Sequence, residues 1–91
     1  MTTENLLIYM KWANHGLRCL EEWKKHPRSK NLKLEVEMST AVCAYLDRKH
    51  SKKATQTLQE YVWRRAYLAK EVSYERYYES GYFDEKFEKI A

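Results

Sequence analysis

Glycine and proline are scarce in this 91-residue chain, which contains two of the former and one of the latter. Tight turns depend on these residue types, so we expect neither a β-sandwich or β-barrel nor a glycine-rich phosphate loop. Long apolar runs are also lacking. The longest, Leu6–Met10, is far shorter than the ~20 residues that cross a bilayer. No signal-peptide pattern follows Met1, and the sequence therefore predicts a cytoplasmic protein without a membrane segment.

Cysteine is equally sparse, with only Cys19 and Cys43 in the chain. We expect two reduced thiols of a cytosolic protein, with a single disulfide as the alternative. His15 lies four residues before Cys19, and His50 lies seven after Cys43, a spacing too loose for a typical structural zinc site. No GxSxG, P-loop, HExxH or CxxC motif occurs. We therefore expect no catalytic residues, no metal, no cofactor and no enzymatic activity.

Helix-forming residues dominate what is present, and apolar residues make up 44% of the chain, enough for a folded core. The breaks at His26–Arg28, Lys49–Ser51 and Gly81 divide the chain. We predict one all-α domain over residues 1–91, an antiparallel bundle of three helices. Their ranges are Thr3–Lys25, Asn31–His50 and Ser51–Ser80, with a short fourth helix starting at Phe83.

The first predicted helix contains a glycine in its interior, Gly16. Such a residue costs about 1 kcal/mol relative to alanine, so something should compensate for it. Either a second helix approaches closely at Gly16, or the helix is interrupted at Asn14–Gly16; we favour a single helix. Its predicted apolar face consists of Leu6, Met10, Ala13, Leu17 and Leu20.

The second segment fits two patterns. Residues 32–38 alternate between apolar and polar, which is typical of a strand. An isolated strand is not stable, so we predict a helix. The alternative is a short strand at 32–38 that pairs with the same strand of a second copy. The helical prediction places on one face Leu34, Met38, Ala41, Val42, Tyr45 and Leu46.

The third predicted helix has apolar residues on two sides. One side is an ordinary core face around Leu58 and Val62. The opposite side presents Trp63, Tyr67, Tyr74 and Tyr78, with Tyr77 at its edge. Other helices, a protein partner or stacked nucleotide bases are the three things that would cover such aromatic rings. We predict that these five residues form a protein interface.

Positive charge is concentrated in residues 24–53, where nine basic residues face three acidic ones. Residues 71–91 have the opposite balance, with three basic and six acidic residues. A polyanion would bind the basic residues through its phosphates, although basic residues are also common in helix C-terminal turns. The candidate phosphate contacts are Lys24, Lys25, Arg28, Lys30, Arg48, Lys49, Lys52 and Lys53. They form two clusters, expected at opposite ends of the second helix and ~25–30 Å apart.

These features predict a small non-enzymatic interaction protein, a modulator or inhibitor of a protein or nucleoprotein partner. Small size, many tyrosines and segregated charge are typical of such proteins in phages and mobile elements. The predicted contact surface is the aromatic stripe on the third helix, and the partner is another protein or a second copy in a homodimer. The alternative is a nucleic-acid-binding protein that contacts phosphates through the basic clusters at 24–33 and 48–53.

Overall fold

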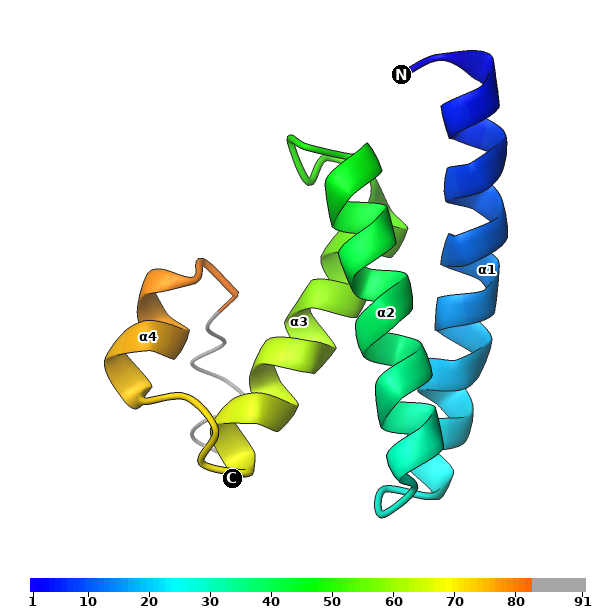
Figure 1. Cartoon of the computed structure of the whole chain (residues 1–91). Coiled ribbons are helices and arrows are strands. Elements are labelled where there is room, and N and C mark those ends of the chain that lie inside the picture. Colours follow the sequence, from blue (N-terminus) through cyan, green and yellow to red (C-terminus); the bar gives the residue numbers. More distant parts are fainter. Residues whose placement is uncertain (83–91) are drawn as a thin grey trace. The chain divides into compact units, whose positions relative to one another are not determined.

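The computed structural model describes residues 1–82, which form four helices and no strand (Figure 1). They are α1 (Thr3–Lys25), α2 (Lys30–Leu46), α3 (Lys53–Leu68) and the short α4 (Tyr74–Glu79). The predicted all-α class is confirmed, and residues 32–38 are helical. The helix expected from Phe83 lies outside the described residues.

Two compact units divide the chain, residues 1–58 and the part from Gln59 onward. The first unit contains α1, α2 and the start of α3, and the second contains the rest of α3 and α4. We describe each unit by itself. That residues 1–91 form one domain stays a prediction.

Helix α1 begins and ends where its sequence predicts. Thr2 caps its N-terminus, where the Thr2 hydroxyl oxygen accepts a hydrogen bond from the Asn5 amide at 3.2 Å. The helix ends before Pro27, which cannot continue the backbone ladder. Between these points it passes through Gly16 without interruption, which confirms the prediction of a single helix.

Gly16 lies where α1 meets its neighbours. Helices α1 and α2 run side by side in opposite directions (Figure 1). A Cβ atom built on Gly16 would lie 2.7 Å from the Ser39 Cβ and 3.3 Å from the Leu58 side chain. The first distance is shorter than ordinary Cβ contacts in proteins, so any larger residue at position 16 would force a neighbour to shift. The predicted close contact at Gly16 is confirmed.

Small and polar side chains fill much of the interior of the first unit. Ser39 and Cys43 are fully buried, and Ala13 and Thr40 are almost so. The buried hydroxyls have partners: Ser39 Oγ donates to the Glu35 carbonyl at 2.8 Å, and Thr40 Oγ1 donates to the Val36 carbonyl at 2.6 Å. Polar atoms are therefore accommodated without the cost of an unmade hydrogen bond.

Most of the apolar face predicted for the second helix is exposed and not buried. Leu34, Met38 and Tyr45 are 56%, 45% and 70% exposed, whereas Val36 and Cys43 on the other side are completely buried. The exposed side carries the more hydrophobic residues, but only the side with Val36 and Cys43 lets α2 approach Gly16 closely. The predicted core face of α1 is also partly wrong, because Leu6 and Met10 are exposed while Ala13 and Leu20 are buried.

The predicted continuous helix Ser51–Ser80 is also wrong, since α3 ends at Leu68 and α4 begins at Tyr74. Lys70 adopts a left-handed backbone, with φ of 60°. The Glu71 amide donates to the Ala66 carbonyl at 2.8 Å, and the Lys70 amide donates to the Tyr67 carbonyl at 3.0 Å. This is a Schellman stop with lysine in the position that glycine usually takes.

Helix α4 has its own start and stop signals. Ser73 caps it, with the hydroxyl oxygen accepting from the Arg76 amide at 3.2 Å. Gly81 follows with φ of 83°, so its predicted role as a left-handed stop is confirmed, although for α4 rather than for one long helix. Ser73 was the signal in the sequence that marked a new helix start.

Candidate functional site

The outward face of α2 carries exposed apolar residues from Leu34 to Tyr45. Leu34, Met38, Ala41 and Tyr45 are spaced i, i+4, i+7 and i+11, and we call these four residues the α2 outer stripe. All four are exposed. They lie opposite Val36, Ser39 and Cys43, which are buried in the first unit. Sequence reasoning identified this apolar face without establishing that it is exposed. The signal it missed was the run of small residues on the other side, which matches Gly16.

Basic residues flank both ends of the α2 outer stripe. Lys30 is the first residue of α2, and Arg48 and Lys49 follow directly after its end. With 17 residues at about 1.5 Å each, α2 separates the two groups by about 25 Å. The predicted placement of the basic clusters at opposite ends of one helix is thus confirmed. All eight predicted phosphate-contacting residues are exposed.

The two clusters differ in their ionic partners. In the first cluster, Lys24 pairs with Glu21 at 3.3 Å and Lys25 pairs with Glu22 at 3.6 Å. In the second, neither Arg48, Lys49 nor Lys52 forms an ion pair with any carboxylate of residues 1–82. The second cluster therefore keeps more of its positive charge for other molecules.

The turn that carries the second cluster is held by Asp47, which is only 5% exposed. Its Oδ1 accepts from the amide and the hydroxyl of Ser51, both at 3.2 Å, and its Oδ2 accepts from the Lys52 amide at 2.8 Å. Burial opposes ionisation of Asp47, but these hydrogen bonds and one from Thr55 outweigh it and lower its pKa below the ordinary value. The buried carboxylate thus stabilises the turn through these hydrogen bonds.

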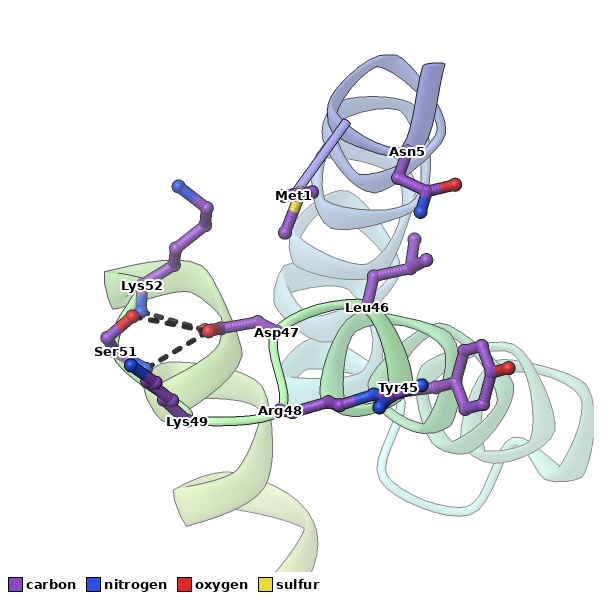
Figure 2. Close-up of a pocket in the computed structure, with 9 residues that line it drawn as sticks. All are labelled: Met1, Asn5, Tyr45, Leu46, Asp47, Arg48, Lys49, Ser51 and Lys52. Atoms are coloured by element: carbon purple, nitrogen blue, oxygen red, sulfur yellow. Dashed lines mark hydrogen bonds between the residues drawn. The ribbon is translucent and has the colours of Figure 1, made fainter. Parts of the chain in front are cut away.

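A hollow of about 550 Å³ lies beside this turn (Figure 2). It is lined by Met1, which precedes α1, by Asn5 of α1 and by Tyr45 and Leu46 of α2. The turn supplies the rest, including Arg48, Lys49 and Lys52. Figure 2 shows the Asp47 carboxylate directed at Ser51 and Lys52. The Arg48 guanidinium lies 5.8 Å from the centre of the Tyr45 ring, and the Lys52 ammonium lies 5.8 Å from that of Tyr9. The lining is therefore basic and aromatic.

Four of the five predicted interface aromatics, the tyrosines, pack against one another in the second unit. The Tyr67 ring stacks on Tyr77 with centroids 5.1 Å apart, and meets Tyr74 edge-on at 6.2 Å. Tyr74 stacks on Tyr78 at 6.5 Å, and the Arg76 guanidinium lies 5.8 Å from the Trp63 ring. These are the offset and T-shaped arrangements that aromatic rings favour.

This aromatic cluster is not a stripe on one helix, because Trp63 and Tyr67 belong to α3 and the other three residues to α4. Tyr77 is 1% exposed and lies in the interior, whereas Tyr74 and Tyr78 are 44% and 61% exposed. The turn at Lys70 folds the rings onto each other instead of presenting them in a row. That Tyr74 and Tyr78 contact a partner stays a prediction.

Neither cysteine is poised as a nucleophile. Burial and the charge of Asp47 raise the pKa of Cys43 to about 11. Burial, with Glu35 and Glu22, raises the pKa of Cys19 as well. His15 Nε2 lies 3.6 Å from Cys19 Sγ and 2.8 Å from Glu35 Oε2, so a single ring nitrogen meets both groups. A catalytic relay needs one nitrogen for the nucleophile and the other for the carboxylate.

Within residues 1–82, no three His, Cys, Asp or Glu side chains are grouped so as to hold a metal ion. None of the described helices is long and apolar enough to cross a membrane. No protein-family model matches the chain, and neither the curated proteins nor the solved structures contain a match to it.

Proposed function

We propose that this chain is a small, non-enzymatic, cytoplasmic interaction protein that binds a partner protein along the α2 outer stripe. The observation that supports the proposal is the continuous exposure of Leu34, Met38, Ala41 and Tyr45 on one helix face. Contiguous exposed apolar surface of this kind marks interaction sites in small proteins. Amphipathic helices that bind in the groove of a partner use apolar residues at the same i, i+4, i+7 spacing.

The charges at the stripe's ends specify the partner's chemistry. Lys30 lies at one end, and Arg48 and Lys49 lie at the other, about 25 Å away. The matching ligand is an amphipathic helix with an apolar face and acidic residues at both of its ends, because charge complementarity selects partner and register. We therefore propose such an acidic helix of another protein as the occupant.

A second copy of this chain fits the α2 outer stripe less well. If two α2 helices pair in parallel, each basic end meets the identical basic end. If they pair antiparallel, Lys30 of one copy approaches Arg48 and Lys49 of the other. Both arrangements bring like charges together, which disfavours self-association through this face.

The test uses two synthetic helical peptides that share leucines at i, i+4, i+7 and i+11 but carry either glutamates or lysines at both ends. We expect the glutamate peptide to bind at least tenfold more tightly in fluorescence anisotropy. The pair Leu34→Glu and Met38→Glu should weaken its binding more than tenfold, because two apolar contacts are lost. The matched control pair, Leu7→Glu and Met10→Glu, changes similarly exposed residues of α1 and should bind as the parent does.

Equal binding of both peptides, or equal loss in the two pairs of variants, would contradict the proposal. Light scattering provides a further decisive outcome. A homodimer that Leu34→Glu and Met38→Glu convert to monomers would show that the stripe's occupant is a second copy and not an acidic helix.

A further inference from the structure

We propose that the basic hollow beside the α2–α3 turn binds single-stranded nucleic acid, with phosphates on Arg48, Lys49 and Lys52 and one base on Tyr45. This goes beyond the protein-binding function proposed for the α2 outer stripe. Of the eight dispersed candidate phosphate contacts, these three share one concave surface with an exposed aromatic ring. The hollow measures about 550 Å³.

Charge is the first argument. The hollow is lined by three basic side chains and one acidic residue, Asp47. The carboxylate of Asp47 is buried and accepts three hydrogen bonds from Ser51 and Lys52, so the donors of the turn offset part of its negative charge. The three cations are exposed and have no carboxylate partner in residues 1–82. An anion that enters the hollow thus meets net positive charge.

Preorganisation is the second argument. Asp47 fixes Ser51 and Lys52, and the His50 carbonyl accepts from the Gln56 side-chain amide at 3.0 Å. His50 itself is held in a left-handed conformation with φ of 51°. The backbone that carries the cations is therefore ordered before any ligand arrives, which lowers the entropic cost of binding.

The aromatic ring selects nucleic acid over other anions. Tyr45 is 70% exposed and lines the same hollow as the cations. A base stacked on such a ring contributes about 1–3 kcal/mol, and every base offers a suitable face. Duplex bases are already stacked inside the helix, so a single strand uses Tyr45 and a duplex does not. An acidic peptide has phosphate-like charge but no bases to stack.

The experiment measures binding of a fluorescent 12-nucleotide oligothymidine by anisotropy. With three phosphates neutralised, log Kobs should fall with log salt at a slope of about −2, or about 20-fold between 50 and 200 mM salt. The pair Lys49→Gln and Lys52→Gln should reduce the slope to about −0.7. The matched control pair Arg28→Gln and Lys30→Gln, at the other end of α2, should leave both slope and affinity unchanged.

Tyr45→Ala tests the stacked base separately from charge. It should weaken oligothymidine binding about 5- to 150-fold and leave binding of an abasic oligomer of the same length unchanged. Circular dichroism and thermal melting should match the parent, because the altered side chains are exposed. Leu34→Glu with Met38→Glu should retain most of the binding, because these two residues do not line the hollow, although Tyr45 belongs to both the hollow and the α2 outer stripe.

Three results would overturn the inference. A duplex of the same length that binds as tightly as the single strand would exclude base stacking on Tyr45. An equal loss of affinity in the two lysine and arginine pairs would show that overall charge, and not the hollow, attracts the strand. Displacement of the strand by inorganic polyphosphate, at equal phosphate concentration, as effectively as by unlabelled oligothymidine would show that any polyanion is bound and that no base is stacked.

Discussion

The two compact units of this chain differ in the side chains at their helix contacts, although the first unit also buries the rings of Tyr9 and Trp23. In the first unit, α1 and α2 meet through Gly16 and Ser39, and small or polar residues fill much of the interior. In the second unit, the interior is aromatic, with Tyr77 1% exposed and stacked on Tyr67. In the first unit, where the helix contact consists of small residues, leucine and methionine of α2 lie exposed on its other side. In the second unit, where the contact consists of large rings, one of these rings is buried.

The difference follows from the lengths of the helices. Two long helices with small residues at their contact can approach closely over many turns, and they gain stability from dense packing. Helix α4 has only six residues and cannot bury much surface by length. Large rings compensate, because each buries on the order of 150–250 Å². The exposed α2 outer stripe is thus a consequence of close packing on the other side of α2.

The largest effect should come from removing the buried ring of the second unit. We expect Tyr77→Ala to destabilise this unit by about 3–5 kcal/mol, because the stacking on Tyr67 is lost and a cavity remains. Hydrogen exchange should accelerate in residues 74–82 and stay unchanged in α1 and α2. The control Tyr78→Ala removes an exposed ring and should cost less than about 1 kcal/mol. Equal acceleration in both units would contradict the division described here.

A smaller effect is expected at the buried carboxylate of the first unit. Asp47→Asn should lower the free energy of unfolding at pH 7 by about 1.5–3 kcal/mol, since charge-assisted hydrogen bonds to Ser51 and Lys52 are weakened. The folded pKa of Asp47 is lowered, so its stabilisation is present above the unfolded pKa of about 3.9 and is lost as pH falls through the folded value.

Urea unfolding at pH 7, 5, 4 and 3 measures this dependence. The parent protein should lose stability below about pH 4, and Asp47→Asn should lack that part of the loss. Glu37→Gln is the control, because Glu37 is exposed and pairs with Lys33 only at 3.9 Å. Identical pH profiles for the parent and Asp47→Asn would show that Asp47 does not hold the turn.

The smallest effect concerns the close contact itself. Gly16→Ala should reduce stability by a net ~1–2 kcal/mol, because overpacking against Ser39 exceeds the ~1 kcal/mol that alanine gains in helix propensity. The control Asn14→Ala changes an exposed residue of the same helix and should be neutral or slightly stabilising. Thermal and urea unfolding measure both. If Gly16→Ala were also stabilising, α1 and α2 would not be in close contact at this residue.

Much of the secondary structure was predictable because its signals are local. The Thr2 cap and Pro27 set the limits of α1. The stop after Leu68 was not predictable from the usual rule, because lysine and not glycine takes the left-handed position at residue 70. Only the serine cap at Ser73 marked the break.

The candidate site was predictable only in part. The basic residues were identified from the sequence and are all exposed. The difference in ion pairing between the two basic clusters was not predicted from the sequence. It depends on Asp47 accepting hydrogen bonds from the amides of Ser51 and Lys52, and on Lys24 pairing with Glu21. Tyr45 was placed on an apolar helix face, and its position beside Arg48 in the lining of the hollow was not predicted.

The amino-acid sequence by itself determined the helical class, the caps, the passage of α1 through Gly16 and the positions of the charges. Each of these depends on residues within a few positions of one another, where backbone hydrogen bonding and side-chain propensity dominate. Only the tertiary structure decided which face of α2 is buried and which rings are covered. Periodicity shows that a helix has an apolar face. The distance to the neighbouring helix, set here by Gly16 against Ser39, decides whether that face or the small-residue face lies inside.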